Sequence, residues 1–261
     1  GFAPFCKAPQ KGCTEMAKPL IAGNWKMHGT AVEAAALARQ LVENEDSCTA
    51  VQLAIFPPIL HVGLVALELS GSSIDLGAQN MSEHESGAFT GEVSADMLKE
   101  AGCTYTLVGH SERRTLFGEV DGTVADKFET AQRSGLVPIL CVGETLQQRQ
   151  QGLTLEVIAE QINTVREKVG LKNICSGVVA YEPVWAIGTG EVASPEQAQL
   201  VHRAIRELLG SSGVSTSLLY GGSVKASNAA ELFAQPDIDG GLVGGASLEA
   251  NEFLKIAQLM T

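Results

Sequence analysis

Short apolar segments recur eight times along the chain, and a stretch that can form a helix follows each of them. The segments are residues 20–25, 51–56, 74–79, 104–109, 136–142, 177–182, 217–222 and 240–245. Several are too apolar to leave one face in water, which is typical of parallel strands covered by helices. Eight such units in about 240 residues predict an α/β fold with a single (β/α)8 barrel. A doubly wound open sheet stays open as the alternative, because alternation does not reveal whether the sheet closes.

The segment 194–210 carries clear signals for the start and the end of a helix. Ser194 is a candidate N-cap, Pro195 takes the first helical position, and Gln197 completes a capping box. Gly210 follows the last apolar position and predicts the end of this helix.

The chain shows no change of composition and no linker that would divide it into two domains. We expect residues 16–261 to form one catalytic domain, since Met16 begins a segment that looks like a natural start. The first fifteen residues lack the apolar core of a secretory signal, so we expect residues 1–15 to be a leader or a disordered extension.

Charge and cysteine content exclude several classes of function. The formal net charge is -12, and the 18 basic residues form no block of the kind that binds nucleic acid. No apolar run approaches the roughly 20 residues that would cross a membrane. Six cysteines are scattered without a C-x-x-C pair, which indicates thiols in a reducing compartment and a cytoplasmic protein with no metal site.

Active sites of (β/α)8 barrels lie at the carboxyl ends of the strands. Polar residues and glycines indeed follow the apolar segments: Asn24, Lys26, Gln79, Asn80, His110, Ser111, Glu182, Gly221, Gly222, Ser223, Gly244 and Gly245.

Three of these side chains form a set that fits proton transfer. Pro183 disfavours the helical region for Glu182, so this carboxylate should sit extended at a strand end. His110 precedes a candidate helical turn, and a helix N-terminus favours the neutral imidazole. With Lys26, they supply the base, the acid and the cation that proton transfer next to a carbonyl requires.

Two glycine-rich segments, YGGSV and LVGGASL, end the last two strands. Backbone amides there can approach an anion closely, which favours a phosphate site, although paired glycines can also simply relieve crowding. Residues 188–193 fit G-x-G-x-x-A, but they do not lead from a strand directly into a helix, so we expect no dinucleotide site.

Six motifs give the chain a more specific interpretation. They are GNWKMHG (23–29), GAFTGEVSADML (87–98), VGHSERR (108–114), AYEPVWAIGTG (180–190), YGGSVK (220–225) and LVGGASL (242–248). With these motifs the chain resembles the triosephosphate isomerase family from about Lys18 to Met260.

The resemblance implies a glycolytic and gluconeogenic enzyme that interconverts dihydroxyacetone phosphate and glyceraldehyde 3-phosphate, by proton transfer through an enediolate, without a cofactor. In that family a glutamate is the base and a neutral histidine polarises the carbonyl, roles that pass to Glu182 and His110 by resemblance. Lys26 and Asn24 would complete the catalytic set. Glu112 and Ser111 would support it.

The resemblance also implies a phosphate site, a lid and a partner subunit. Backbone amides near Gly188, Ser223, Gly244 and Gly245 would bind the phosphate. The segment 183–190 resembles a mobile lid that excludes water, with PVW (183–185) and GTG (188–190) as its hinges and Ala186 and Ile187 as an apolar tip. The family is usually dimeric, and Thr90 would reach the partner's site in a homodimer.

Two alternatives stay open. A sugar-phosphate epimerase on the same fold would need His and Asp metal ligands at the strand ends, and no such set stands there. A barrel kept as a binding or scaffold protein could dispense with Lys26, His110 or Glu182, yet all three are present.

Overall fold

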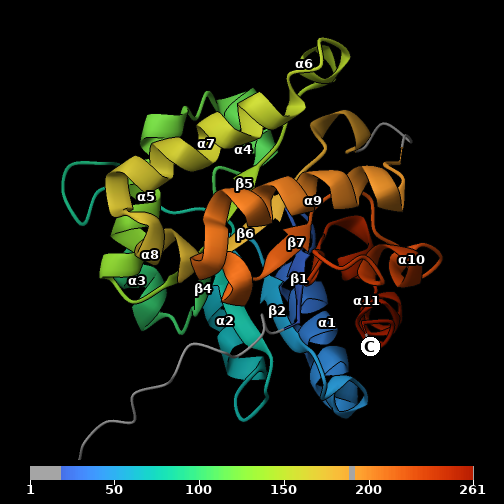
Figure 1. The fold of residues 1–261 in the computed structure, drawn as a ribbon. Helices are drawn as coiled ribbons and strands as arrows, with labels where there is room; N and C mark the ends of the chain where they lie inside the picture. Colours follow the sequence, from blue (N-terminus) through green and yellow to red (C-terminus); the bar gives the residue numbers. More distant parts are fainter. Residues whose placement is uncertain (1–18, 188–191, 261) are drawn as a thin grey trace, which may run out of the picture.

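Eight parallel strands form a closed barrel in the order of the sequence, from β1 to β8, in this computed structural model (Figure 1). The structure describes residues 19–187 and 192–260. The strands are β1 Leu20–Asn24, β2 Gln52–Phe56, β3 Asp75–Ala78, β4 Tyr105–Val108, β5 Val137–Val142, β6 Val178–Tyr181, β7 Leu218–Tyr220 and β8 Gly240–Val243. β8 pairs back with β1, so the sheet closes and the open doubly wound alternative is wrong.

Helices follow the strands and surround the barrel (Figure 1). The α-helices are α1 Ala31–Asn44, α2 Val62–Glu68, α3 Ala95–Glu100, α4 Ser111–Phe117, α5 Asp121–Arg133, α6 Leu146–Gln150, α7 Thr154–Val169, α8 Leu171–Cys175, α9 Pro195–Leu209, α10 Ala229–Phe233 and α11 Ala250–Gln258. Short 3-10 turns lie at Glu45–Cys48, Ile59–His61, Val184–Ala186, Gly210–Ser215 and Gly245–Leu248.

The helix expected after residue 194 has the predicted ends. The Ser194 side chain accepts a hydrogen bond from the Gln197 backbone, the Gln197 side chain returns the contact, and Pro195 is the first helical residue. Gly210 follows the last turn with a φ of 60°, a backbone conformation that a glycine adopts at little cost. The capping signals in the sequence therefore fix both ends of α9.

Alternating side chains along the strands build two separate apolar cores. In β1, Leu20 and Ala22 point into the barrel, whereas Ile21 packs between the sheet and the helices. The inner core contains Leu20, Ala22, Ala54, Phe56, Leu107, Ile139, Cys141, Val178, Ala180, Leu219 and Leu242. Because both faces of each strand are buried, the strands read as continuous apolar runs in the sequence.

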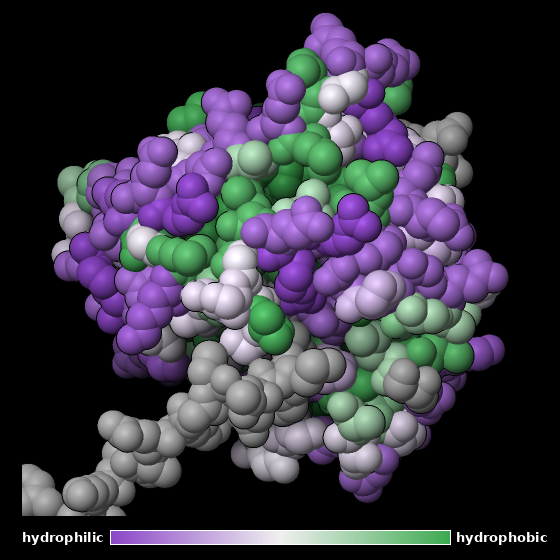
Figure 2. Space-filling view, in the orientation of Figure 1, coloured by the Kyte–Doolittle hydropathy of each residue, from purple (hydrophilic) through white to green (hydrophobic). Residues whose placement is uncertain are grey.

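The face of the protein shown in Figure 2 is mostly hydrophilic, with apolar side chains gathered between α7 and α9. They line a groove of about 240 Å³ formed by Leu155, Ile158, Ala159, Ala204, Ile205 and Leu208. None of the described helices is long and apolar enough to cross a membrane.

The cysteines of the described segments are free thiols. Cys48, Cys103 and Cys141 are buried and Cys175 is partly exposed, while the other two cysteines of the sequence precede residue 19. Within residues 19–187 and 192–260, no group of three or more His, Cys, Asp and Glu side chains could hold a metal ion.

Candidate active site

A cavity of about 360 Å³ opens at the carboxyl ends of the strands, where the βα loops meet. Its lining consists of Asn24, Lys26, His110, Glu112, Glu182, Ile187, Gly221, Gly222, Ser223, Val224, Lys225, Leu242, Gly244, Gly245 and Ala246. Most of the expected site residues therefore converge on one cavity. Ser111 touches it through Glu182, Thr90 lies on a separate exposed loop, and Gly188 lies outside the described residues.

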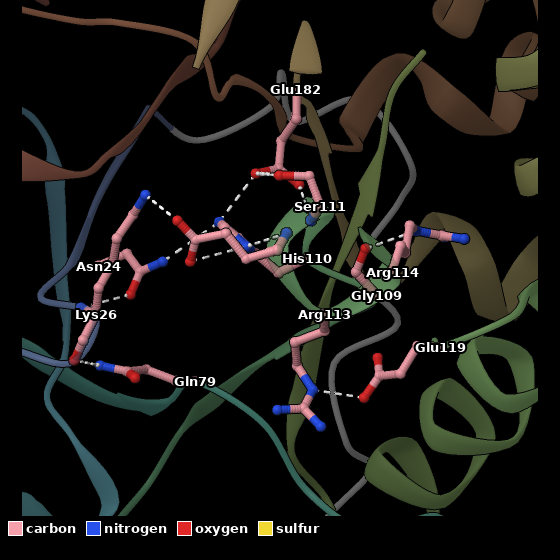
Figure 3. A network of polar contacts seen from close by, with 11 residues as sticks. Asn24, Lys26, Gln79, Gly109, His110, Ser111, Arg113, Arg114, Glu119 and Glu182 are labelled. Atoms are coloured by element: carbon pink, nitrogen blue, oxygen red, sulfur yellow. Dashed lines mark hydrogen bonds and ion pairs between the residues drawn. The ribbon is translucent and has the colours of Figure 1, made fainter. Parts of the chain in front are cut away.

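Glu182 is held at the end of β6 by four contacts (Figure 3). Its backbone amide donates to the Val142 carbonyl at 2.7 Å, which fixes the main chain beside β5. Ser111 donates its amide to Oε2 at 2.9 Å and its hydroxyl to Oε1 at 3.1 Å. His110 Nε2 lies 2.9 Å from Oε1. The Glu182 side chain is only 2% exposed, so these contacts replace the hydration of its carboxylate.

Two opposing effects set the pKa of Glu182. Complete burial raises it, because the charged form loses its water. The contact with His110 and the two hydrogen bonds from Ser111 together outweigh burial, and the pKa lies below its ordinary value. Glu182 is therefore ionised at neutral pH in this position.

His110 caps the N-terminus of α4 with its own ring. The Glu112 amide donates to Nδ1 at 3.2 Å, so Nδ1 holds a lone pair and Nε2 carries the proton in the neutral ring. This tautomer follows from the hydrogen-bond pattern, and it points the Nε2 proton at Glu182.

The protonation of His110 differs in direction from the sequence-based expectation of a neutral ring. Burial lowers the pKa of His110, as a helix N-terminus would, but the Glu182 carboxylate at 2.9 Å and the nearby Glu112 outweigh burial and raise it. The sequence could not show this, because the carboxylate arrives from β6, 72 positions further along the chain. The raised pKa of His110 depends on Glu182 remaining in this position.

Lys26 has a strained backbone at the cavity wall. Its φ of 52° is the only positive φ of a non-glycine residue within the described segments. Its amide donates to Asn24 Oδ1 at 3.0 Å, and Gln79 donates to its carbonyl at 2.8 Å. The ammonium lies 2.5 Å from Glu112 Oε1, and Asn24 Nδ2 lies 3.4 Å from His110 Nε2 (Figure 3). These contacts direct the cation into the cavity.

Glycines surround Glu182 because larger residues would collide with it. A Cβ at Gly143 would lie 1.8 Å from the Glu182 carbonyl oxygen, so β5 and β6 can approach only with glycine there. A Cβ at Gly221 would lie 2.9 Å from Glu182 Cγ. A Cβ at Gly244 would only touch the Lys26 side chain, at 3.4 Å from Cε. The glycine-rich strand ends therefore also make room for the charged side chains.

A buried carboxylate that sequence reasoning missed anchors the segment after Glu182. Glu144 is 0% exposed, and its Oε1 accepts hydrogen bonds from Trp185 Nε1 at 2.9 Å, Tyr181 OH at 3.2 Å and Arg149 at 3.1 Å. Its place two residues after β5, in the sequence VGE, is the signal that could have indicated it.

The expected lid is described only in its first part. Pro183 leads into the 3-10 turn Val184–Ala186, and Ile187 lines the cavity. Ala186 is buried, so it forms no exposed tip. The second expected hinge, residues 188–190, lies outside the described residues.

Cys141 is a second residue that the sequence did not single out. It lies inside the barrel below Glu182 and is completely buried, and burial together with the adjacent carboxylate raises the pKa of its thiol well above the ordinary value. Arg114 bridges the same region, donating to the carbonyls of Gly109 at 2.7 Å and Cys141 at 3.2 Å. The thiol is therefore protonated and fills space beneath the carboxylate.

A second cavity of about 390 Å³ shares the wall formed by Asn24, Lys26, His110 and Glu112. It opens toward the loop that precedes α3, and exposed apolar side chains surround it. Met27 and Phe117 are among the residues that line it, and they are 93% and 67% exposed, which is unusual for such large apolar side chains.

Comparisons with known proteins agree with this geometry. A family model described as triosephosphate isomerase matches residues 19–260. A protein named triosephosphate isomerase from Dechloromonas aromatica is 56% identical over 247 residues, covering 93% of this chain and 99% of that protein. Proteins of the same name from Thiobacillus denitrificans and Nitrosococcus oceani are 55% and 50% identical, and cover 98% and 99% of their own lengths with 93% of this chain.

Proposed function

Because the chain belongs to the triosephosphate isomerase family, it is a triose-phosphate isomerase, and we propose which of its residues carry the reaction. The enzyme interconverts dihydroxyacetone phosphate and D-glyceraldehyde 3-phosphate, a step of glycolysis. The observation that carries the assignment is the convergence of Glu182, His110 and Lys26 on one cavity.

Glu182 is the base in this proposal. Its carboxylate removes a proton from C1 of dihydroxyacetone phosphate, which leaves an enediolate, and then returns the proton to C2. To reach carbon, the side chain must leave Ser111 and His110, the groups that lower its pKa. Its basicity therefore rises as it turns toward the substrate, because burial remains and the stabilising contacts do not.

His110 and Lys26 stabilise the charge that develops on the substrate oxygens. The Nε2 proton of His110 is donated to the carbonyl oxygen, and the ring then moves a proton between O1 and O2. Once Glu182 has turned away, the main cause of the raised pKa of His110 is gone and the neutral ring is favoured. Lys26 supplies positive charge beside the enediolate, with Asn24 next to it and Glu112 and Ser111 in support.

The phosphate occupies the glycine-rich end of the cavity in this proposal. Backbone amides near Ser223, Gly244 and Gly245 face it, and Gly188 contributes from the lid. Two hydrogen bonds from Ser247 to the Gly244 carbonyl hold the turn after β8, the hydroxyl at 2.7 Å and the amide at 2.8 Å. Lid closure then excludes water from the base and the enediolate.

The test compares the wild type with Glu182→Gln in a coupled dehydrogenase assay. We expect kcat to fall by about 10²- to 10⁴-fold, the usual contribution of a general base. Glu167→Gln on the outer helix α7 is the matched control and should leave kcat unchanged. A folded Glu182→Gln variant with wild-type turnover would refute the assignment of the base. A folded wild type without turnover would instead favour the scaffold alternative.

We propose a homodimer in which the loop bearing Thr90 of each subunit closes the second cavity of the other subunit. The exposed Met27, Leu60 and Phe117 support this, because their burial against a partner would remove large apolar surface from water. Sedimentation should give a mass near twice the 27.4 kDa of the chain. A wild-type monomer with full activity would contradict the dimer.

We also propose that residues 16–261 form one catalytic domain that works in the cytoplasm. The free thiols at Cys48, Cys103, Cys141 and Cys175 support a reducing compartment. Residues 1–18 lie outside the described part of the chain. Limited proteolysis with mass spectrometry would test the domain limit, which a stable core beginning well after residue 19 would refute.

A further inference from the structure

The lysines and glutamates that line the substrate cavity balance in charge, so they give it no excess of positive charge for a phosphorylated substrate. Two cationic side chains line it within the described residues, Lys26 and Lys225, and the carboxylates of Glu112 and Glu182 oppose them. The whole chain carries a formal net charge of -12. A phosphate monoester carries almost two negative charges at neutral pH, so capture depends on local positive charge.

Lys26 is not free to supply that charge alone. Its ammonium already lies 2.5 Å from Glu112 Oε1, so an approaching anion meets a neutralised pair. Glu182, deeper in the cavity, adds further negative potential. The second cation, Lys225, therefore sets the electrostatic potential that an incoming anion meets at the mouth of the cavity.

Lys225 has the placement that this role needs. It follows β7 and precedes α10 (Figure 1), and it lines the cavity two residues after Ser223. Its backbone is fixed, because its amide donates to Asn228 Oδ1 at 2.8 Å and its carbonyl accepts from the amides of Asn228 and Ala229. Asn228 also donates to the Ser223 carbonyl at 3.0 Å, which ties the lysine to the phosphate end of the cavity.

The Lys225 side chain is exposed, and no ion pair found between described residues includes it. The Glu252 carboxylate approaches the next residue, Ala226, whose amide donates to it at 2.8 Å, but it forms no ion pair with Lys225 among the described residues. The ammonium of Lys225 thus stands in solvent at the cavity mouth, where its field reaches over roughly one Debye length, about 8 Å at physiological ionic strength.

We propose that Lys225 is the capture cation of this enzyme, which attracts the phosphate dianion of the substrate into the cavity and takes no part in proton transfer. The inference rests on the proposed function of the cavity. It separates two roles for the two lysines. Lys26 is partly buried and paired with Glu112, and acts on the enediolate and the bound phosphate, whereas Lys225 is exposed and acts on the encounter rate.

The test measures kcat/KM for D-glyceraldehyde 3-phosphate over a range of ionic strength in Lys225→Gln, Lys225→Glu and Lys225→Arg. At low ionic strength we expect Lys225→Gln to lose about two- to five-fold in kcat/KM, the effect of one charge about 10 Å from a dianion in water. Lys225→Glu should lose about the square of that factor. Lys225→Arg should match the wild type, and kcat should stay constant throughout.

A matched control removes the same charge elsewhere. Lys172 is exposed on α8, which precedes β6 and so lies at the opposite end of the barrel from the cavity. Lys172→Gln should leave kcat/KM unchanged at every ionic strength. The deficit of Lys225→Gln should shrink toward zero at about 0.5 M salt, where the Debye length falls to roughly 4 Å.

D-glyceraldehyde, which lacks the phosphate, separates charge loss from structural damage. Its slow isomerisation should be equally fast in the wild type and in Lys225→Gln, because no anion has to be captured. An equal loss for both substrates, a loss that persists at high salt, or an unaffected kcat/KM in Lys225→Gln would overturn the inference. A wild type that turns over neither substrate would overturn the proposed function itself.

Discussion

Gly221→Ala should displace the carboxylate of Glu182, the proposed base, without unfolding the barrel. The new Cβ would lie 2.9 Å from Glu182 Cγ and 3.1 Å from the Tyr181 carbonyl oxygen, whereas ordinary contact begins at 3.4 Å. The Tyr181 carbonyl is fixed by the Gly221 amide at 2.7 Å, so the Glu182 side chain must give way by about half an ångström. The added methyl therefore acts mainly on the position of the base.

The size of the effect follows from that displacement. Since a misplacement of 1 Å can cost about 10²-fold, we expect kcat to fall about ten-fold and KM to change by less than about two-fold. The free energy of unfolding should fall by about 1–3 kcal/mol from overpacking. Steady-state assays in both directions and urea denaturation measure the two quantities.

A second glycine provides the control. Nothing lies within 4 Å of a Cβ added at Gly122 on α5, so Gly122→Ala should keep wild-type kinetics and stability within about 1 kcal/mol. Wild-type kcat in Gly221→Ala would refute the reasoning, because it would mean that the position of Glu182 does not depend on this contact.

Three other buried polar side chains give further expected outcomes. Burial lowers the pKa of His202 from 6.5 to about 4. As the pH drops through this window the unfolded chain binds the proton before the folded chain does. The free energy of unfolding should therefore fall by up to about 1.4 kcal/mol per pH unit. Denaturation curves of His202→Asn should lose that slope, and an unchanged slope would contradict the assignment. Glu144→Gln should raise the mobility of Trp185, seen as a changed tryptophan fluorescence, and lower the free energy of unfolding by about 1–3 kcal/mol; an identical spectrum and stability would count against this anchor. Lys127→Met should lower the free energy of unfolding by about 3–5 kcal/mol, because it leaves the Glu119 carboxylate with one fewer cation in a buried network. An unchanged free energy of unfolding by calorimetry would argue against this role.

The strands and most site positions could be predicted because local sequence encodes them. Continuous apolar runs mark strands buried on both faces, and the polar residues that follow them lie at the same end of a parallel barrel. Asn24, His110 and Glu182 lie at the strand ends to which this rule assigns them, and all three line one cavity. The observed strands differ from the predicted segments only by one to three residues at their ends.

The features that could not be predicted depend on contacts between distant segments. Lys26 has a strained φ, and its carbonyl is held by Gln79, which arrives from the end of the third strand. The burial of Glu144 requires Trp185 and Tyr181 to arrive from the sixth unit. No local pattern encodes such partners, because each residue alone reads as an ordinary polar or apolar position.

The closed barrel brings the residues after β4 next to the carboxylate after β6, so the resting contacts of Glu182 can control its pKa in the proposed reaction. The base must be ionised before the substrate arrives and strongly basic once it has arrived. In the resting position Ser111 and His110 lower the pKa of Glu182 and keep it charged despite complete burial. These donors lie on the fourth unit, whereas Glu182 directly follows β6 and is followed at once by Pro183 and the start of the proposed lid. In the proposed reaction, a movement of Glu182 away from these partners would raise its pKa while the same movement brings the carboxylate to the substrate.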